Sequence, residues 1–201
     1  MVNISSDEKK ERIARATLLV IQKGGFAMAT YRTIAEESGF SLGSIQNFFK
    51  TQNELYKFAM ETIVKNGEAR ANALKLFSSD VSVAEFYRLL YQFLPLDAER
   101  RTELTAWMAF VTRAASEPSL MDIARQMISN NYRSLELSIA FMQQCGLFNK
   151  QLAVKEASQR LYVFLEGISL HSIVLPQQYT EAVIKEMVQR YVQDNLITNE
   201  I

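Results

Sequence analysis

The chain has 201 residues, 48% of them hydrophobic, and its 22 basic residues balance its 22 acidic ones. This length and composition allow a buried core, and the zero net charge excludes a polybasic protein that coats nucleic acid or anionic membranes without selection. The single cysteine, Cys145, excludes an intrachain disulfide framework, and no apolar run approaches the roughly 18 residues of a membrane span. The N-terminal residues lack the pattern of a signal peptide, so we expect a cytoplasmic protein with no membrane partner.

Apolar residues recur three and four positions apart along most of the chain, which predicts an all-helical protein. The first helix is expected over about residues 5–23, with the glycines at 24 and 25 as its C-cap. Two short helices follow. Thr30 is placed to cap the first and Ser41 the second, and Gly39 ends the first in a conformation that glycine tolerates. The pattern is helix, tight turn, helix.

The remainder of the chain is expected to form a larger helical body. A long helix over about residues 53–77 leads into it. Breaks at residues 78–80, 95–97, 117–119, 145–151 and 175–180 then separate five more helices, which makes about nine in all. We therefore predict a small helix-turn-helix domain over residues 1–52 and a larger helical domain over residues 53–201.

The residues GFSLG at 39–43 also fit the G-x-S-x-G pattern of a hydrolase nucleophile elbow, with Ser41 as the nucleophile. That motif requires a strand before the serine, then an Asp or Glu and a His further along. His171 does follow, but the residues before Ser41 have helical periodicity. We read Ser41 as a helix cap and expect no enzyme; a serine hydrolase is the remote alternative.

The second short helix has the composition of a helix that reads a DNA major groove. Ile45 and Phe49 would form its buried face. The outward face is then formed by Leu42, Gly43, Ser44, Gln46 and Asn47. Gln46 and Asn47 can each hydrogen bond to adenine, and Arg32 on the preceding helix can contact guanine or a phosphate.

The segment ATYRTIAEESGFSLGSIQNFFKTQNELY resembles the DNA-binding signature of the TetR family of bacterial repressors. The residues at the family's characteristic positions are Thr30, Arg32, Ile34, Ala35, Gly39, Gly43, Ser44, Ile45, Phe49, Lys50 and Leu55. The resemblance implies that Thr30, Lys50 and the start of the recognition helix from Ser41 contact phosphates, and that Arg32, Gln46 and Asn47 lie nearest to the bases.

Four residues depart from the family pattern: Leu42, Gln46, Phe48 and Gln52. Leu42, Phe48 and Gln52 stand where the family often has phosphate partners, so we expect weaker nonspecific binding and a shallower salt dependence than a more basic relative would show. Lys9, Lys10 and Arg12 on the first helix could compensate. Further along, FLPLDAERRTELTAWMAF is similar to the corresponding region of the BetI-like branch of the family.

The body is rich in aromatic and thioether side chains, which suit an ordinary core as well as the adaptable walls of a site for an apolar small molecule. The candidate effector-binding residues are Tyr91, Trp107, Met108, Phe110, Met127, Tyr132, Phe164 and His171. His171 has no companion ligands at metal-binding spacing, so no metal or cofactor is expected.

The last two helices carry apolar stripes at helical spacing that exceed what one body needs to bury. The candidate dimer contacts are Val154, Leu161, Ile168, Ile184, Met187, Val188 and Tyr191. The family resemblance implies a four-helix interface between two copies. We therefore predict a homodimeric repressor, with residues 1–52 as its DNA-binding domain and residues 53–201 as its ligand-binding and dimerisation domain. A small, mostly apolar effector is expected to release it from double-stranded operator DNA. A helical binding or adaptor protein without specific DNA affinity is the alternative.

Overall fold

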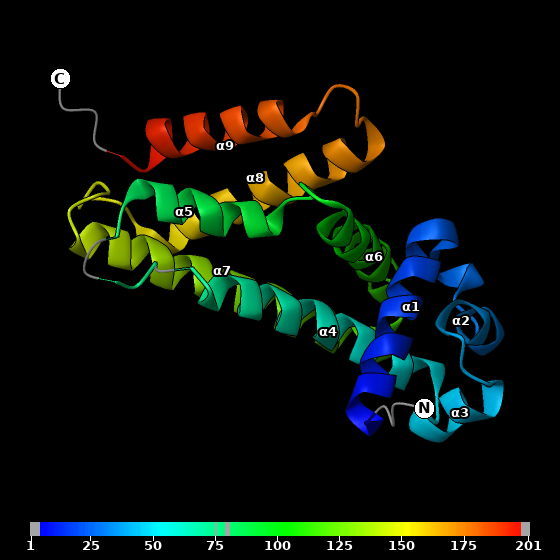
Figure 1. The fold of residues 1–201 in the computed structure, drawn as a ribbon. Helices are drawn as coiled ribbons and strands as arrows, with labels where there is room; N and C mark the ends of the chain where they lie inside the picture. The colour runs from blue at the N-terminus through cyan, green and yellow to red at the C-terminus, as the bar shows by residue number, and fades with distance from the viewer. Residues whose placement is uncertain (1–4, 75, 79–80, 198–201) are drawn as a thin grey trace. The chain divides into compact units, whose positions relative to one another are not determined.

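The computed structural model describes residues 5–74, 76–78 and 81–197. These residues form nine α-helices and one short 3-10 turn, η1, and contain no strand (Figure 1). The elements are α1 (Ser6–Met28), α2 (Tyr31–Ser38), α3 (Leu42–Phe48), α4 (Gln52–Asn72), α5 (Val83–Leu90), η1 (Tyr91–Phe93), α6 (Ala98–Ala114), α7 (Pro118–Gln144), α8 (Val154–Val174) and α9 (Glu181–Asn195). The all-helical prediction is confirmed.

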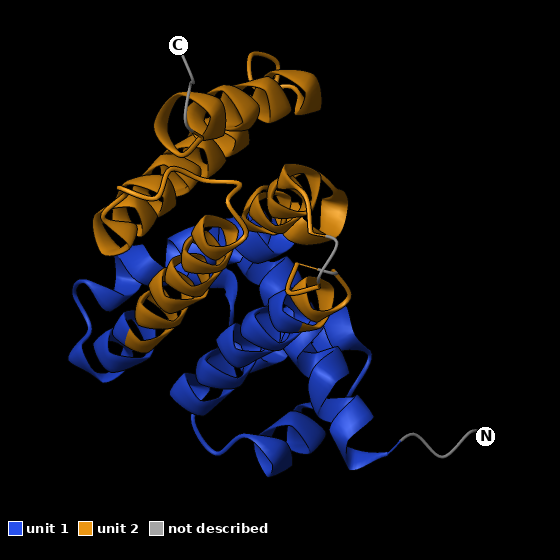
Figure 2. Ribbon diagram, turned by 90° about the vertical axis from the view of Figure 1, so that its left-hand side faces the viewer, with its two compact units in different colours: residues 1–68, 102–125 blue, residues 69–101, 126–201 orange. Residues whose placement is uncertain are grey.

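The chain divides into two compact units (Figure 2). Unit 1 holds the described residues up to Glu68 together with Thr102–Arg125. Unit 2 holds Ala69–Arg101 and the described residues from Gln126 onward. Most of α6 and the start of α7 thus belong to the same unit as α1, α2 and α3. The boundary predicted after residue 52 concerns the functions of the two domains and not this division into compact units, so it stays a prediction.

Helix α1 continues past the glycine pair that was predicted to end it. Gly25 leaves the helical region with φ 69° and ψ −174°, and the chain then resumes a helical turn as far as Met28. Glycine adopts a positive φ without a steric penalty, so the pair bends α1 instead of terminating it. The bend directs Phe26 to the ring of Tyr56, where the two rings pack edge to face with centroids 4.8 Å apart.

The later breaks fall largely where the sequence placed them. Helix α4 ends at Asn72, five residues before the predicted end, and residues 79 and 80 of the first predicted break lie outside the described part of the chain. The other four breaks separate α5 and η1 from α6, α6 from α7, α7 from α8, and α8 from α9. These four predictions are confirmed. The helices break at these places because turn-forming residues interrupt an otherwise continuous helical periodicity.

Unit 2 has its own hydrophobic core. Side chains from α5, α7, α8 and α9 meet in it, with Phe86, Leu135, Leu161 and Val188 fully buried. Helices α8 and α9 run side by side, and α5 packs against α9 (Figure 1). Burial of such side chains stabilises the fold by about 1.5–3 kcal/mol each.

Two glycine-to-alanine changes in unit 1 are expected to alter stability in opposite directions. Gly39 ends α2 at φ 75°, where a Cβ is strained, so Gly39→Ala should lower the free energy of unfolding by about 1 kcal/mol. Gly67 lies inside α4, and no atom comes within 4 Å of the position a Cβ would take, so Gly67→Ala should raise it by about 0.5–1 kcal/mol. Urea unfolding followed by circular dichroism measures both changes. Shifts of the same sign would contradict this account.

Candidate functional site

Local hydrogen bonds hold the starts of α2 and α3 and the turn that joins these two helices. Thr30 Oγ1 accepts a hydrogen bond from the Thr33 amide at 3.3 Å, and Ser41 Oγ accepts one from the Ser44 amide at 3.2 Å. Gly39 ends α2 in the left-handed region, and its amide donates to the Ala35 carbonyl at 3.0 Å. The predicted caps are confirmed, and they satisfy backbone groups that a short helix would otherwise leave unpaired.

Helix α3 has one buried and one exposed face, as predicted. Ile45 and Phe49 are buried, whereas Leu42 is 45% exposed. Gly43, Gln46 and Asn47 are exposed and Ser44 is half-buried. The exposed face is therefore small and polar apart from Leu42, which is the kind of surface that fits between the walls of a major groove.

Two contacts beyond the turn fix α2 and α3 in place. The Tyr31 hydroxyl donates to the Phe49 carbonyl at 3.0 Å, which ties the start of α2 to the end of α3, and burial raises the pKa of Tyr31. The Arg12 guanidinium lies 5.0 Å from the centre of the Phe40 ring and donates to the Ser38 carbonyl at 3.5 Å. Arg12 thus packs on the turn, a role that sequence analysis did not assign to it.

The predicted phosphate and base partners beside α3 are accessible. The side chain of Arg32 is 86% exposed, with only a 3.4 Å contact to Glu36. Lys50 is exposed, and its Nζ donates to the Gln46 carbonyl at 3.4 Å. Exposed contacts of this kind contribute little to stability, so both cations can turn to an anionic partner at small cost.

Comparison with known proteins identifies the family. Residues 84–196, more than half of the chain, match the C-terminal family of BetI-type transcriptional repressors. The chain belongs to the TetR family. The predicted BetI-like character of the body is confirmed.

Individual relatives agree with this assignment. The transcriptional regulator PksA of Bacillus subtilis is 27% identical over 196 residues, which cover 94% of this chain and 91% of PksA. A solved structure of a regulator from Saccharomonospora viridis in complex with choline is 20% identical, with a TM-score of 0.86 over 96% of this chain and 100% of that one. The multidrug-binding protein EbrR, solved with malachite green, is 22% identical, with a TM-score of 0.64 over 91% of this chain and 97% of that one. These two structures establish the shared fold.

The serine hydrolase alternative loses its structural basis. Ser41 follows α2 and caps α3, and the described residues contain no strand that could present a nucleophile. The relatives are transcriptional regulators, not enzymes. Within the described residues no helix is long and apolar enough to cross a membrane, and no cluster of at least three His, Cys, Asp or Glu could hold a metal ion.

The eight predicted effector residues are divided between the two compact units. Trp107, Met108 and Phe110 belong to unit 1, where Trp107 stacks on Phe110 with ring centroids 6.0 Å apart. The other five belong to unit 2: Tyr91, Met127, Tyr132, Phe164 and His171. In unit 2, Tyr91, Tyr132 and Phe164 all pack against the hydrophobic core. Phe164 stacks on Tyr191 at 4.2 Å, and His171 is exposed with its ring 5.5 Å from that of Tyr179, so it is no buried pocket group.

Around Tyr132, unit 2 contains a polar and aromatic group that sequence analysis missed. We call it the Tyr162 cluster; it consists of Phe93, Asn131, Tyr132, Tyr162 and Glu166. The rings of Tyr132 and Phe93 meet the Tyr162 ring edge-on, with centroids 4.9 and 6.3 Å away, and Asn131 Nδ2 donates to the Tyr162 hydroxyl at 3.0 Å. Burial raises the pKa of Tyr162, and the nearby Glu166 carboxylate raises it further.

A separate small hollow of about 80 Å³ lies between the N-terminal part of α8 and the C-terminal part of α9. Glu156, Arg160, Tyr191 and Asn195 are among the residues that border it. None of the predicted effector residues lines this hollow, so it offers no support for the predicted effector set.

The predicted dimer contacts need a correction. Leu161, Ile168, Ile184 and Val188 are each at most 3% exposed in the single chain, because they pack in the core of unit 2 and cannot present a surface to a partner. The remaining three, Val154, Met187 and Tyr191, are half-buried.

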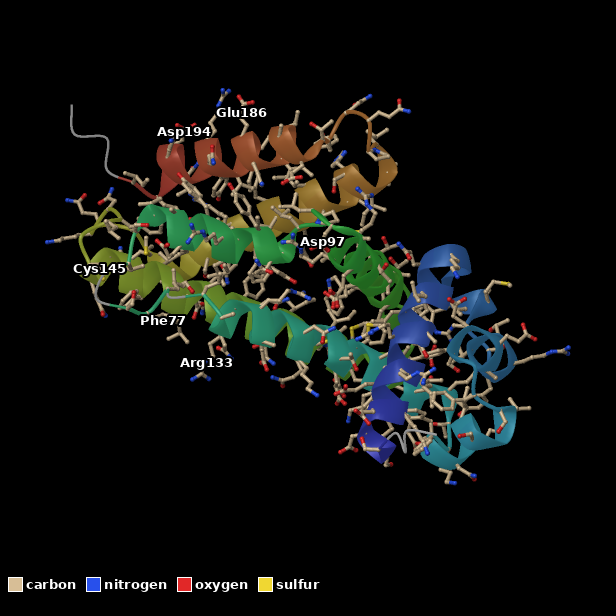
Figure 3. All side chains as sticks on the ribbon, viewed as in Figure 1. Phe77, Asp97, Arg133, Cys145, Glu186 and Asp194 are labelled. Carbon is tan, nitrogen blue, oxygen red and sulfur yellow. The ribbon has the colours of Figure 1, made fainter. Side chains whose placement is uncertain are left out.

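The opposite face of α8 carries the exposed apolar side chains. Val163 is 62%, Leu170 50% and Val174 65% exposed. With Gly167, these residues are spaced four, three and four positions apart, so they lie on one face of the helix. We call them the α8 outer stripe. Glu186 and Asp194 project from the side of α9 that faces away from α8 (Figure 3).

Proposed function

We propose that this protein is a homodimeric cytoplasmic repressor that binds double-stranded operator DNA through α3 and is released by a small effector. The exposed face of α3 carries this proposal. Gln46 and Asn47 point outward from a helix that Ile45 and Phe49 anchor on the other side. Membership of the TetR family supports the same reading.

The proposed DNA contacts follow from this geometry. Gln46 and Asn47 each pair with adenine through N6 and N7, and Arg32 reaches a guanine or a phosphate. The missing Cβ of Gly43 lets the backbone of α3 approach the groove, and nothing lies within 4 Å of the place a Cβ would take. The residues proposed to approach phosphates are Thr30, Ser41, Leu42, Ser44 and Lys50; Leu42 would do so through its backbone.

The proposed dimer uses the α8 outer stripe. Three exposed apolar side chains on one face are best covered by a second copy, and Gly167 in their midst lets a facing helix come close. The half-buried Val154, Met187 and Tyr191 would border the contact. Two α3 helices in a symmetric dimer then read half-sites about 34 Å, or a multiple of it, apart.

The proposed effector is a small cation on a mostly apolar frame, bound at the Tyr162 cluster. Aromatic faces attract a cation most strongly when it is removed from water, and the Glu166 carboxylate supplies an opposite charge. The Saccharomonospora viridis regulator was solved with choline and EbrR with malachite green, both of which are cations. Binding of effector would favour a conformation that fits the operator less well, and DNA must then weaken effector binding by the same factor.

Fluorescence anisotropy on tiled fragments of the DNA flanking the gene, at two salt concentrations, tests the function. We expect saturable binding to one near-palindromic tile, with a scrambled fragment at least about tenfold weaker. Because Leu42, Phe48 and Gln52 replace common phosphate partners, the salt dependence should be shallow. Equal, weak binding to every fragment would reject the repressor and favour the adaptor alternative.

Choline and an uncharged analogue of choline test the proposed effector class. Choline is expected to reduce operator binding, whereas dimethylbutanol, its uncharged carbon isostere, should have little effect. Glu166→Gln should weaken the choline response about tenfold because a buried cation loses its opposite charge. Glu186→Gln, on the exposed side of α9, is the matched control and should respond as the wild type does. Equal responses to choline and dimethylbutanol would contradict a charge-selective site.

A further inference from the structure

Arg113, near the C-terminal end of α6, contacts three side chains of unit 1, one in the turn after α6 and two on other helices. Its Nε lies 2.8 Å from Glu117 Oε2. Its guanidinium carbon lies 5.3 Å from the centre of the Phe26 ring and 5.7 Å from that of Tyr56. Phe26 belongs to α1 and Tyr56 to α4, so one planar cation joins α6 to both helices. Such a contact depends on the delocalised guanidinium and is not reproduced by lysine.

Glu117 connects the same place to the start of α4. Its Oε1 accepts hydrogen bonds from Asn53 Nδ2 at 3.1 Å and from the Ser119 hydroxyl at 3.2 Å, while Asn53 also reaches Ser119 Oγ at 3.0 Å. Burial alone would raise the pKa of Glu117, but the hydrogen bonds from Asn53 and Arg113 hold the pKa below its usual value. The carboxylate is therefore charged near neutral pH, and it fastens the turn between α6 and α7 to α4.

Tyr56 carries the connection to the DNA-reading helices. Its hydroxyl donates to the Ala29 carbonyl at 2.9 Å, and both residues are buried. Ala29 directly precedes Thr30, the N-cap of α2. A continuous set of contacts thus runs from Glu117 through Arg113 and Tyr56 to the first residue of the helix-turn-helix.

We infer that Arg113 and Glu117 are positioning residues for operator recognition, which fix the start of α2 although neither lies on α2 or α3. The inference rests on the proposed function and deepens it. If the α6–α7 turn is displaced while the contacts Glu117–Arg113, Arg113–Tyr56 and Tyr56–Ala29 persist, the Ala29 carbonyl is displaced with it. A movement of this turn therefore changes how α2 and α3 are presented to DNA.

The test measures operator affinity for Arg113→Gln, Glu117→Gln and the double variant, with folding checked by circular dichroism. Each single change should weaken specific binding about tenfold. The double change should add less than about twofold to the larger single effect, because both break the same connection. Arg125→Gln removes an equal charge from an exposed 3.4 Å ion pair with Asp122 on α7, and it should bind as the wild type does.

The salt dependence of operator binding distinguishes a positioning role for Arg113 from a direct contact between Arg113 and DNA. If Arg113 touches no phosphate, the slope of log affinity against log salt stays unchanged in Arg113→Gln, whereas loss of one phosphate contact would reduce it by about one. A reduced slope would overturn the positioning role. Arg113→Lys keeps the charge and loses the planar contact, so it should fail to restore affinity.

If the Arg113 variants do not fold, Tyr56→Phe tests the same inference. It removes only the hydroxyl that reaches Ala29 and should weaken operator binding about threefold or more. Wild-type protein that binds no fragment would reject the proposed function and this inference with it. If the wild type binds and the folded Arg113, Glu117 and Tyr56 variants all bind equally well, the inference fails while the proposed function stands.

Discussion

A dimer that carries Gln46→Ala and Asn47→Ala is expected to keep its fold but no longer distinguish its operator from scrambled DNA. Both side chains are exposed on α3, so their loss removes no core packing, and alanine is a better helix former than either. Each bidentate contact with adenine contributes about 1–3 kcal/mol of discrimination against the wrong base. Loss of two such contacts in each half-site leaves mainly phosphate binding, which carries no sequence information.

Anisotropy with the operator tile and its scrambled form measures this change as the ratio of two affinities. A matched control is available on α7, where Gln126 and Asn130 are exposed and joined by a 2.9 Å hydrogen bond. Gln126→Ala with Asn130→Ala removes the same two kinds of side chain far along the sequence from α3, and should leave the ratio unchanged. Retained selectivity in the Gln46 and Asn47 variant would show that another surface reads the sequence.

The features of the helix-turn-helix that could be predicted from sequence depend on short-range chemistry. Thr30 and Ser41 cap helices by bonding three residues ahead, and Gly39 is needed at the position where φ is positive. Ile45 and Phe49 are four residues apart on one helix, so periodicity alone assigns them to the same buried face. Each of these predictions needed only a few neighbouring residues.

The contacts that hold the helix-turn-helix in place could not be predicted in that way. Tyr31 bonds to Phe49 across 18 residues of sequence, and Asn53 bonds to Glu117 across 64. No local pattern marks Arg113 as the partner of two aromatic rings. A single sequence contains the residue types but gives no sign of which helices meet.

The dimer residues show a different limit of sequence analysis. Helix α8 has two stripes at helical spacing, and hydrophobicity favoured the one that includes Leu161 and Ile168, which the structure places in the core. The core-facing side of α8 also holds the buried serines Ser169 and Ser172, and Ser169 donates to the Phe93 carbonyl at 2.9 Å. Periodicity identifies apolar faces of a helix, but only tertiary packing decides which of them is covered within the chain.

Leu170→Glu is expected to convert the proposed dimer into a folded monomer with little operator affinity. Leu170 is 50% exposed in the single chain, so glutamate is tolerated there without loss of the core. In a symmetric interface the substitution places two like charges in an apolar contact and removes two leucine side chains from it. Because burial of one such side chain contributes about 1.5–3 kcal/mol, the loss of two should weaken a micromolar dimer by at least about a hundredfold. A monomer also loses the second half-site, and with it about two to four orders of magnitude in affinity for the operator.

Sedimentation velocity measures the oligomeric state, and anisotropy on the operator tile measures the affinity of the same samples. Gln193→Glu is the control, since Gln193 is exposed on α9 beside Asp194 and outside the α8 outer stripe. It should remain dimeric and bind normally. A Leu170→Glu protein that stays dimeric would place the interface on another surface. One that becomes monomeric yet keeps full operator affinity would separate dimerisation from DNA recognition, because the two half-sites would then be read independently.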